Sequence, residues 1–87
     1  MAVNGRDRHA FVNPAGLVFE IVCFRTAPGC RRAGAPTAEW TWFPGYAWRL
    51  AVCGRCAVHL GWAYQGTADA FFGLIPDRLV NDPGSPP

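Results

Sequence analysis

The sequence predicts a small, mostly β domain whose strands are antiparallel and joined by hairpins. Two observations lead to this fold class. Short apolar runs recur along the chain, and none keeps the 3.6-residue period of a helix. Glycine and proline interrupt these runs every few residues, as they do in the turns between strands. With 87 residues, 51% of them hydrophobic, the chain has room for one domain and enough apolar side chains for a core.

The first part of the chain predicts two strands, at residues 9–12 and 17–24. The turn signal Asn13-Pro14-Ala15-Gly16 separates them, because proline fixes one dihedral angle and glycine permits unusual ones. The polar residues 1–8 are expected to form a flexible lead. Residues 26–38 contain two prolines and two glycines, so a loop is expected there.

The second part predicts an extended segment at residues 40–42 and a turn at Phe43-Pro44-Gly45-Tyr46. Strands are expected at residues 47–52 and 58–64, on either side of a Cys-x-x-Cys knuckle. Residues 71–80 predict one or two closing strands. The chain therefore divides into the lead, one domain at residues 9–80, and a tail at residues 81–87 that is expected to be disordered.

The charge pattern excludes several classes of partner. Eight basic and six acidic residues give a net charge of +2, and they are scattered without a basic stripe, so nucleic-acid binding is not expected. No apolar run has the length of a membrane span. The first residues lack the apolar core of a secretory signal. We therefore expect a cytoplasmic protein that binds neither nucleic acid nor membranes.

The tryptophans are the most unusual feature of the composition. Four occur in the chain, with Tyr46 and Tyr64 close to them in sequence: Trp40, Trp42, Trp48 and Trp62. Residues two apart on a strand share a face, and the Pro44-Gly45 turn can bring Trp48 opposite Trp42. Such indoles could form the core of a small β protein. They could also wall a box that binds a compact ligand by dispersion and desolvation.

The four cysteines favour metal binding over disulfides in a chain without an export signal. Cys53-Gly54-Arg55-Cys56 has the spacing of half a zinc site, and a structural zinc ion needs two further ligands. The possible additional ligands are Cys23, Cys30, His9 and His59, but their positions favour other roles. Cys23 lies in an apolar strand and His59 in another, where packing in the core is the simpler interpretation.

Catalysis finds little support in the sequence. The only serine, Ser85, lies in the tail, and the two histidines have no obvious nucleophile or carboxylate partner in sequence. A zinc deaminase would need His-x-Glu and Pro-Cys-x-x-Cys, and both are absent. No glycine-rich phosphate loop occurs. We therefore expect a protein that is not an enzyme.

The chain contains the run Trp42-Phe43-Pro44-Gly45-Tyr46-Ala47-Trp48, followed by Cys53-x-x-Cys56 and His59-Leu60-Gly61-Trp62. Together these motifs resemble the cereblon-type thalidomide-binding (CULT) domain, above all that of single-domain bacterial members. Phe11-Val12-Asn13-Pro14-Ala15-Gly16 is similar to the family's Asn-Pro turn, and Phe71-Phe72-Gly73-Leu74-Ile75 to its closing strand. The resemblance runs from about His9 to Val80.

The resemblance implies a β-tent, in which two small antiparallel sheets stand at an angle and zinc pins them, with Cys53 and Cys56 among its ligands. It also implies a cage for cyclic imides, in which the Trp40 carbonyl accepts from the imide N–H and the Trp42 amide donates to an imide oxygen. The residues expected at this site are Asn13, Pro14, Phe19, Trp40, Thr41, Trp42, Trp48, Trp62 and Tyr64, with Phe19 at the floor and Tyr64 at the rim.

Two positions depart from the family pattern. The family carries an earlier Cys-x-x-Cys that completes the zinc site, and this sequence lacks that pair, so an N-terminal part of the tent is expected to be missing. Trp40 stands where animal members have histidine, which removes a side-chain hydrogen bond to the ligand and leaves the backbone pair in place.

The expected partner is a small cyclic imide, such as a glutarimide, a uracil-type base, or a peptide end cyclised from glutamine or asparagine; no ligase partner is evident. Three alternatives remain open. A methionine sulfoxide reductase-like enzyme shares the fold but needs a cysteine after Cys56, and there is none. A reader of methylated amines would use the same aromatic box, with Glu39 as the nearest carboxylate. The third alternative is a structural zinc-ribbon adaptor, for which we would expect the aromatic box to be dry and filled.

Overall fold

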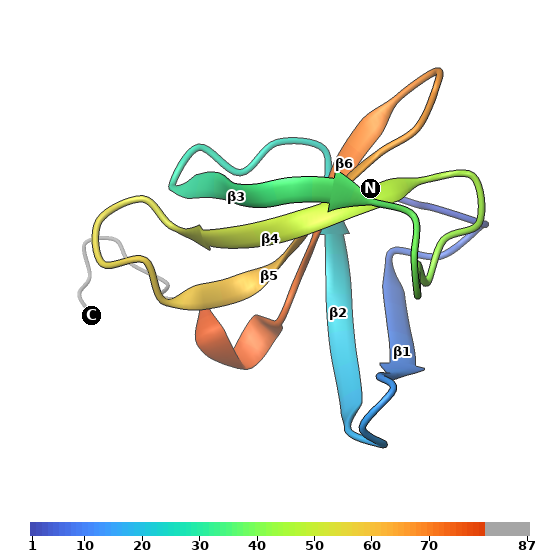
Figure 1. Ribbon diagram of the computed structural model, residues 1–87, viewed down its shortest axis with the longest axis horizontal. Helices are drawn as coiled ribbons and strands as arrows, with labels where there is room; N and C mark the ends of the chain where they lie inside the picture. The colour runs from blue at the N-terminus through green and yellow to red at the C-terminus, as the bar shows by residue number, and fades with distance from the viewer. Residues whose placement is uncertain (80–87) are drawn as a thin grey trace.

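The computed structural model describes residues 1–79, which fold into one six-stranded antiparallel sheet with the strand order β1-β2-β6-β5-β4-β3 (Figure 1). The strands are β1 (Arg8–Val12), β2 (Val18–Phe24), β3 (Cys30–Thr37), β4 (Ala47–Cys53), β5 (His59–Gln65) and β6 (Ala70–Leu74), followed by the 3-10 turn η1 (Pro76–Arg78). The predicted mostly β, antiparallel class is therefore confirmed.

The sheet has two halves that run in different directions. In Figure 1, the β1–β2 hairpin crosses the direction of β3, β4 and β5. β6 joins the halves, because it pairs with β2 at Val22–Phe24 and with β5 at Gly61–Gln65. The expected two sheets at an angle are thus present as two halves, with continuous hydrogen bonding through β6.

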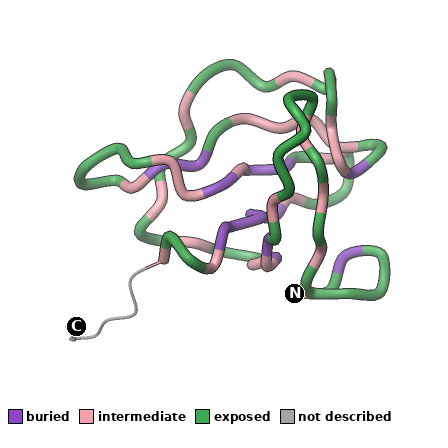
Figure 2. Tube along the Cα trace, turned by 90° about the horizontal axis from the view of Figure 1, so that it is seen from below, coloured by how far each residue is buried: buried purple, intermediate pink, exposed green. Residues whose placement is uncertain are grey.

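The core divides between the two faces of the sheet, as the alternation of side chains along a strand requires. Tyr64 and Phe71 join the larger cluster, whose other buried members are Val3, Ile21, Cys23, Phe43 and Ile75. The opposite face buries Ala51, Ala63, Phe72 and Leu74. Figure 2 shows these buried stretches of the central strands between exposed turns.

The expected loop at residues 26–38 is wrong over most of its length, because β3 occupies Cys30–Thr37. The pairing with β4 shifts between Ala33 and Thr37, which brackets Gly34 at a φ of 80° and Pro36. An edge strand tolerates proline, since one side of its backbone needs no ladder hydrogen bonds. The glycine and proline residues that predicted a loop therefore belong to an irregular edge strand.

The predicted extended segment at residues 40–42 is also wrong. These residues lie in the connection between β3 and β4, and Trp40 has a φ of 62°. The Thr41 amide donates to the Ala38 carbonyl over 3.3 Å, which closes a turn. At the other end of the chain, one closing strand, β6, is followed by η1 at Pro76.

The predicted lead, residues 1–8, packs against the sheet. Val3 is only 7% exposed, and the amino terminus donates to the Cys23 carbonyl over 3.0 Å. The Cys23 amide in turn donates to the Asp7 carbonyl over 2.9 Å. An apolar side chain and free backbone groups thus draw this segment onto β2. Val80 and the predicted disordered tail lie outside the described residues.

Candidate ligand-binding site

The connection between β3 and β4 carries two of the tryptophans of the site, Trp40 and Trp42. Phe43, 1% exposed, anchors this connection by packing edge-to-face against Tyr64 at 4.8 Å and Phe71 at 5.0 Å between ring centroids. The Trp48 indole N–H donates to the Glu39 carbonyl over 2.7 Å and so ties β4 to the same connection. Trp40 adopts the left-handed region, which is costly for a bulky residue and is often found at functional sites.

Strands β4 and β5 supply two further aromatic walls. Trp48 pairs with Tyr64 across the two strands, and Trp62 lies two residues before Tyr64, so all three side chains share one face of the sheet. Trp42 packs edge-to-face on Trp62, with 4.8 Å between ring centroids and 70° between planes. Its indole N–H donates to the Val12 carbonyl over 3.3 Å, which links the wall to the β1–β2 hairpin.

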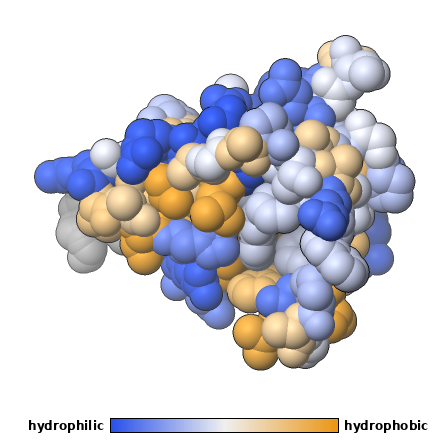
Figure 3. Space-filling model, in the orientation of Figure 1, coloured by the Kyte–Doolittle hydropathy of each residue, from blue (hydrophilic) through white to orange (hydrophobic). Residues whose placement is uncertain are grey.

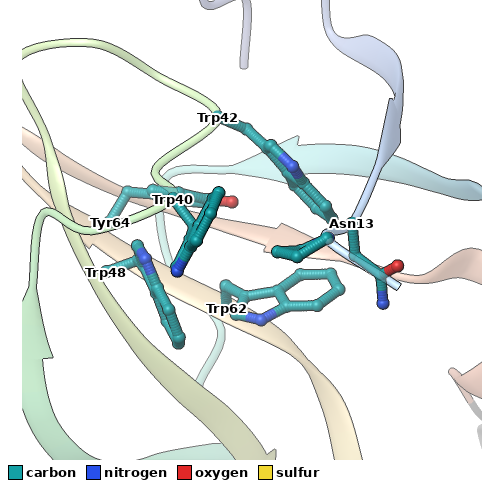
Figure 4. A pocket seen from close by; sticks show the side chains of 7 residues that line it. Asn13, Trp40, Trp42, Trp48, Trp62 and Tyr64 are labelled. Atoms are coloured by element: carbon teal, nitrogen blue, oxygen red, sulfur yellow. The ribbon is translucent and has the colours of Figure 1, made fainter. Parts of the chain in front are cut away.

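These side chains enclose a cavity of about 200 Å³ (Figure 4). The residues that line it are Asn13, Pro14, Trp40, Trp42, Trp48, Trp62 and Tyr64, all of which the sequence had predicted. Pockets for drug-sized ligands usually measure about 300–1,000 Å³. The cavity therefore suits a compact ring.

Two of the predicted site residues lie outside the lining. Phe19 supports the walls from behind, since its ring centroid is 6.1 Å from that of Trp42 and 5.3 Å from that of Trp62. Thr41 is used within its own connection: its hydroxyl accepts from the Phe43 amide and donates to the Phe43 carbonyl, both at 3.3 Å. Phe19 and Thr41 therefore lie next to the lining residues, and their assignment to the ligand site stays a prediction.

The polar groups available to a ligand are few. Within residues 1–79, the Trp40 carbonyl and the Trp42 amide have no protein hydrogen-bond partner, whereas the indole N–H groups of Trp42 and Trp48 are both engaged. Among the described residues, no charged side chain lines the cavity, and Glu39 lies outside it with an exposed side chain. This lining favours a neutral ligand over a methylated ammonium ion, for which a carboxylate is usual.

Tyr64, which was expected at the rim, is buried instead and contributes a deep polar atom to the cavity. The residue is 3% exposed, and its ring stacks on Phe71 at 5.0 Å. Its hydroxyl points toward the space beneath Trp40 in Figure 4 and has no protein partner in the described part of the chain. Burial raises the pKa of this phenol, so the group stays protonated and can still donate a hydrogen bond.

His59 and Arg78 support Trp62 and were not recognised as site residues. The His59 ring meets Trp62 edge-to-face at 5.0 Å, and its Nε2 lies 2.8 Å from the Gly61 carbonyl. The Arg78 guanidinium donates to Nδ1 and to the His59 carbonyl, each over 3.3 Å. Burial lowers the pKa of His59, and the neutral Nε2–H tautomer fits these partners. Arg78 lies 19 residues from His59, so this contact leaves no local signal in the sequence.

The predicted metal ligands Cys53 and Cys56 form a knuckle at the far end of β4. The Arg55 amide donates to Cys53 Sγ over 3.4 Å, and the Ala57 amide donates to the Cys53 carbonyl over 2.9 Å. Hydrogen bonds from the backbone amides of Cys56 and Arg55 lower the pKa of Cys53, as a thiolate ligand requires. The knuckle therefore fits one half of a tetrahedral zinc site.

None of the other possible zinc ligands completes this half site. Within residues 1–79, no group of three or more cysteine, histidine or acidic side chains gathers in a way that could hold a metal ion. Cys23 is buried in the core, and the His9 ring packs on Phe43 at 5.1 Å. His59 is engaged with Gly61 and Arg78. Cys30 lies opposite Cys53 in the sheet and lines one cavity with Cys53 and Cys56, but these three cysteines do not gather closely enough to hold a metal ion.

The sequence is similar to part of the cereblon protein of several animals. It is 41% identical to protein cereblon of Gallus gallus over 76 residues, which is 82% of this chain and 17% of that protein. It is 42% identical to protein cereblon of Danio rerio over 76 residues, which is 82% of this chain and 18% of that protein. It is also 42% identical to protein cereblon of Xenopus tropicalis over 75 residues, which is 80% of this chain and 17% of that protein. No protein-family model matches the sequence.

These similarities support a cereblon-type domain over most of the chain, which spans less than a fifth of the length of these relatives. The expected nearness to bacterial members stays a prediction. Among residues 1–79, no helix is long and apolar enough to cross a membrane.

Proposed function

From a cereblon-type domain with an aromatic cavity, we propose that this chain is a non-enzymatic binding module for cyclic imides. The observation that carries the proposal is the cavity itself. Four indoles wall it, and the unpartnered Trp40 carbonyl and Trp42 amide lie in the connection that forms one side.

The chemistry of an imide complements these groups. An imide presents an acceptor, a donor and an acceptor along one edge. The Trp40 carbonyl can accept from the imide N–H, and the Trp42 amide can donate to one imide oxygen. The aliphatic part of the ring then packs against the indoles of Trp42, Trp48 and Trp62, where dispersion and desolvation favour it. The Tyr64 hydroxyl offers a further hydrogen bond to a polar group deep in the cavity.

The expected affinity is moderate. A glutarimide ring has about eight heavy atoms, and small ligands gain roughly 0.7–1 kcal/mol per atom, which gives a Kd of about 1–100 µM. This range suits sensing of an abundant small molecule or of a modified chain end.

The β1–β2 hairpin beside the cavity would suit a ligand that continues as a peptide. Asn13 and Pro14 line the cavity at the turn of this hairpin. The neighbouring side chains Val12, Leu17 and Val18 are 58%, 59% and 69% exposed. The turn of the β1–β2 hairpin lies at the lower end of the view in Figure 1, and Figure 3, in the same orientation, shows hydrophobic surface there. A peptide whose terminal Gln or Asn has cyclised could bury its preceding side chains there.

Titration of tryptophan fluorescence with a glutarimide ligand tests the proposal. We expect saturable quenching with a Kd of about 1–100 µM. The N-methylated imide is the matched control ligand, because it keeps the ring but loses the N–H donor; we expect it to bind at least about 10-fold more weakly, since the carbonyl stays unpaired. Absence of quenching in a chain shown to be folded would exclude the imide. Tighter binding of choline would instead favour the reader of methylated amines.

We also propose that Cys53 and Cys56 are two ligands of a structural zinc ion, which would stabilise the end of β4 when bound. Cobalt(II), which takes tetrahedral thiolate sites, gives a visible readout. We expect a thiolate-to-cobalt absorption band that zinc abolishes by displacing the cobalt. The band should disappear in Cys53→Ser and in Cys56→Ser and persist in the control Cys30→Ser. A band that survives Cys56→Ser would contradict this ligand pair.

We also propose, from the sequence, that this binding module acts in the cytoplasm without nucleic-acid or membrane partners. The charged residues are scattered along the chain and give a net charge of +2, so there is no basic stripe for nucleic acid. A role with a ligase is not proposed, since the similarity covers only 17–18% of each animal relative discussed above.

A further inference from the structure

Cys30 and Cys53 face each other across the last pair of the β3–β4 ladder. Cys30 opens β3, Cys53 closes β4, and the register pairs the two residues directly. The next pair outward is hydrogen-bonded, because the Gly54 amide donates to the Gly29 carbonyl over 2.9 Å. In an antiparallel ladder the two kinds of pair alternate, so Cys30 and Cys53 form a non-hydrogen-bonded pair.

The remaining backbone hydrogen bonds agree with this assignment. The Cys30 amide donates to the Ala27 carbonyl and the Cys53 amide to the Val58 carbonyl, each over 2.9 Å, so neither binds the other cysteine. Non-hydrogen-bonded partners have their Cα atoms about 4.5 Å apart, with side chains close together on one face. Disulfides occur at Cα separations of about 4.4–6.8 Å, so the two sulfurs can meet without a change of strand pairing.

Both thiols can be reached from solvent. They are half-buried and line the same open cavity of about 540 Å³, on the face of the sheet opposite the tryptophan cage. Cys56 lines this cavity too, and the other walls are mostly apolar and include Phe24, Val58, Leu60 and Leu79. A small oxidant can therefore enter, whereas Cys23 on the other face is 0% exposed.

We propose that Cys30 and Cys53 are a redox-active pair that forms a reversible cross-strand disulfide. With a hydroperoxide as oxidant, one thiolate attacks the peroxide oxygen, the O–O bond breaks, and a sulfenic acid and one water or alcohol result. The second thiol then attacks the sulfenic sulfur, the S–S bond forms, and one water leaves. Two thiols lose two electrons and two protons in total, which the peroxide accepts. A dithiol reverses the reaction.

The disulfide would change two properties of the chain. It would tie the edge strand β3 to β4 covalently, and it would remove Cys53 from the knuckle that we propose for zinc. In a reducing compartment such a bond is transient and typical of redox sensing. The inference concerns the face opposite the cage and does not depend on imide binding.

Disulfide mapping tests the pair, because trypsin places each cysteine in a separate peptide. Cleavage after arginine releases residues 26–31 with Cys30, residues 50–55 with Cys53, and residues 56–78 with Cys56. The purified chain is treated with one equivalent of hydrogen peroxide, alkylated and digested. We expect the free thiols to fall from four to two and the peptides 26–31 and 50–55 to be joined, with full recovery after dithiol treatment.

Two variants separate the alternatives. Cys56→Ser removes the only competing partner in the knuckle and should still lose two thiols with the same linkage. Cys30→Ser should abolish that linkage. A product that joins mainly peptides 50–55 and 56–78, or complete alkylation of Cys30 after oxidation, would overturn the proposal. If the disulfide does not form but the chain binds imides, only the thiol-pair proposal is overturned. If the disulfide forms but the chain does not bind imides, only the proposed imide binding is overturned.

Discussion

Replacing Trp48 with alanine is expected to weaken glutarimide binding by at least about 100-fold, or about 2.7 kcal/mol. Two losses combine in this variant. One wall of the cavity disappears, and buried tryptophans at binding sites commonly contribute about 2 kcal/mol or more. The hydrogen bond from the Trp48 indole to the Glu39 carbonyl, 2.7 Å long, disappears too, which releases the connection that carries Trp40 and Trp42. Fluorescence titration or calorimetry measures the loss.

Two matched variants separate these contributions. Trp48→Phe keeps an aromatic wall but removes the indole N–H, so we expect an intermediate loss that reports on the anchoring of the connection. Trp40→Ala removes a side chain that lines the same cavity but is 68% exposed, so less contact area is lost and the effect should stay within about 10-fold. A Trp48→Ala protein that is folded by circular dichroism and binds within about 3-fold of the unchanged chain would argue against the cage.

The strands that the sequence predicts well are those with local signals. β2, β4 and β5 each contain consecutive β-branched, aromatic or aliphatic residues and end at a turn signal, so their positions followed from periodicity alone. β3 could not be predicted in this way. Its sequence, CRRAGAPT, contains glycine and proline and few apolar residues, and it exists as a strand because β4 offers a partner. Edge pairing is a tertiary effect that a local pattern does not record.

The site divides in the same way. Trp48, Trp62 and Tyr64 could be placed together because the alternation of side chains along paired strands determines which of them share a face. The expectation that the Pro44-Gly45 turn brings Trp48 opposite Trp42 is wrong, since Trp48 pairs with Thr37 and Tyr64, and Trp42 reaches the cavity from the connection between β3 and β4. The conformation of Trp40 could not be predicted, since a left-handed residue without glycine depends on the surrounding packing. Phe11 on β1, which stacks on Trp42 at 5.0 Å, and Arg78 in η1, which contacts His59, were missed because they reach the cage from elements far from the tryptophans in sequence.

The largest expected loss of stability comes from Gly61→Ala. Gly61 lies on β5 beside β6, and a Cβ atom there would overlap the Gly73 carbonyl oxygen and lie 2.8 Å from the Leu74 Cα. Both neighbours are backbone atoms of β6, so they cannot move without opening the pairing of β5 with β6. Overpacking usually costs about 1–3 kcal/mol and occasionally more, and we expect the upper end or beyond. For a domain of this size, 1 kcal/mol corresponds to about 4–8 °C, so Tm should fall by at least about 10 °C.

Gly29→Ala is the matched control, because an added Cβ at Gly29 meets no atom within 4 Å. Its Tm should stay within about 4 °C of the unchanged chain, since surface substitutions usually cost less than about 0.5 kcal/mol. A Gly61→Ala protein with an unchanged Tm would mean that β5 and β6 are less closely paired than in the structure.

The Gly61→Ala variant also tests how the two halves of the sheet hold the cage together. β6 joins the two halves of the sheet, and the cavity takes Asn13 and Pro14 from one half and Trp48 and Trp62 from the other. Loosening this joint should therefore weaken imide binding even at temperatures where the chain stays folded, although Gly61 does not line the cavity.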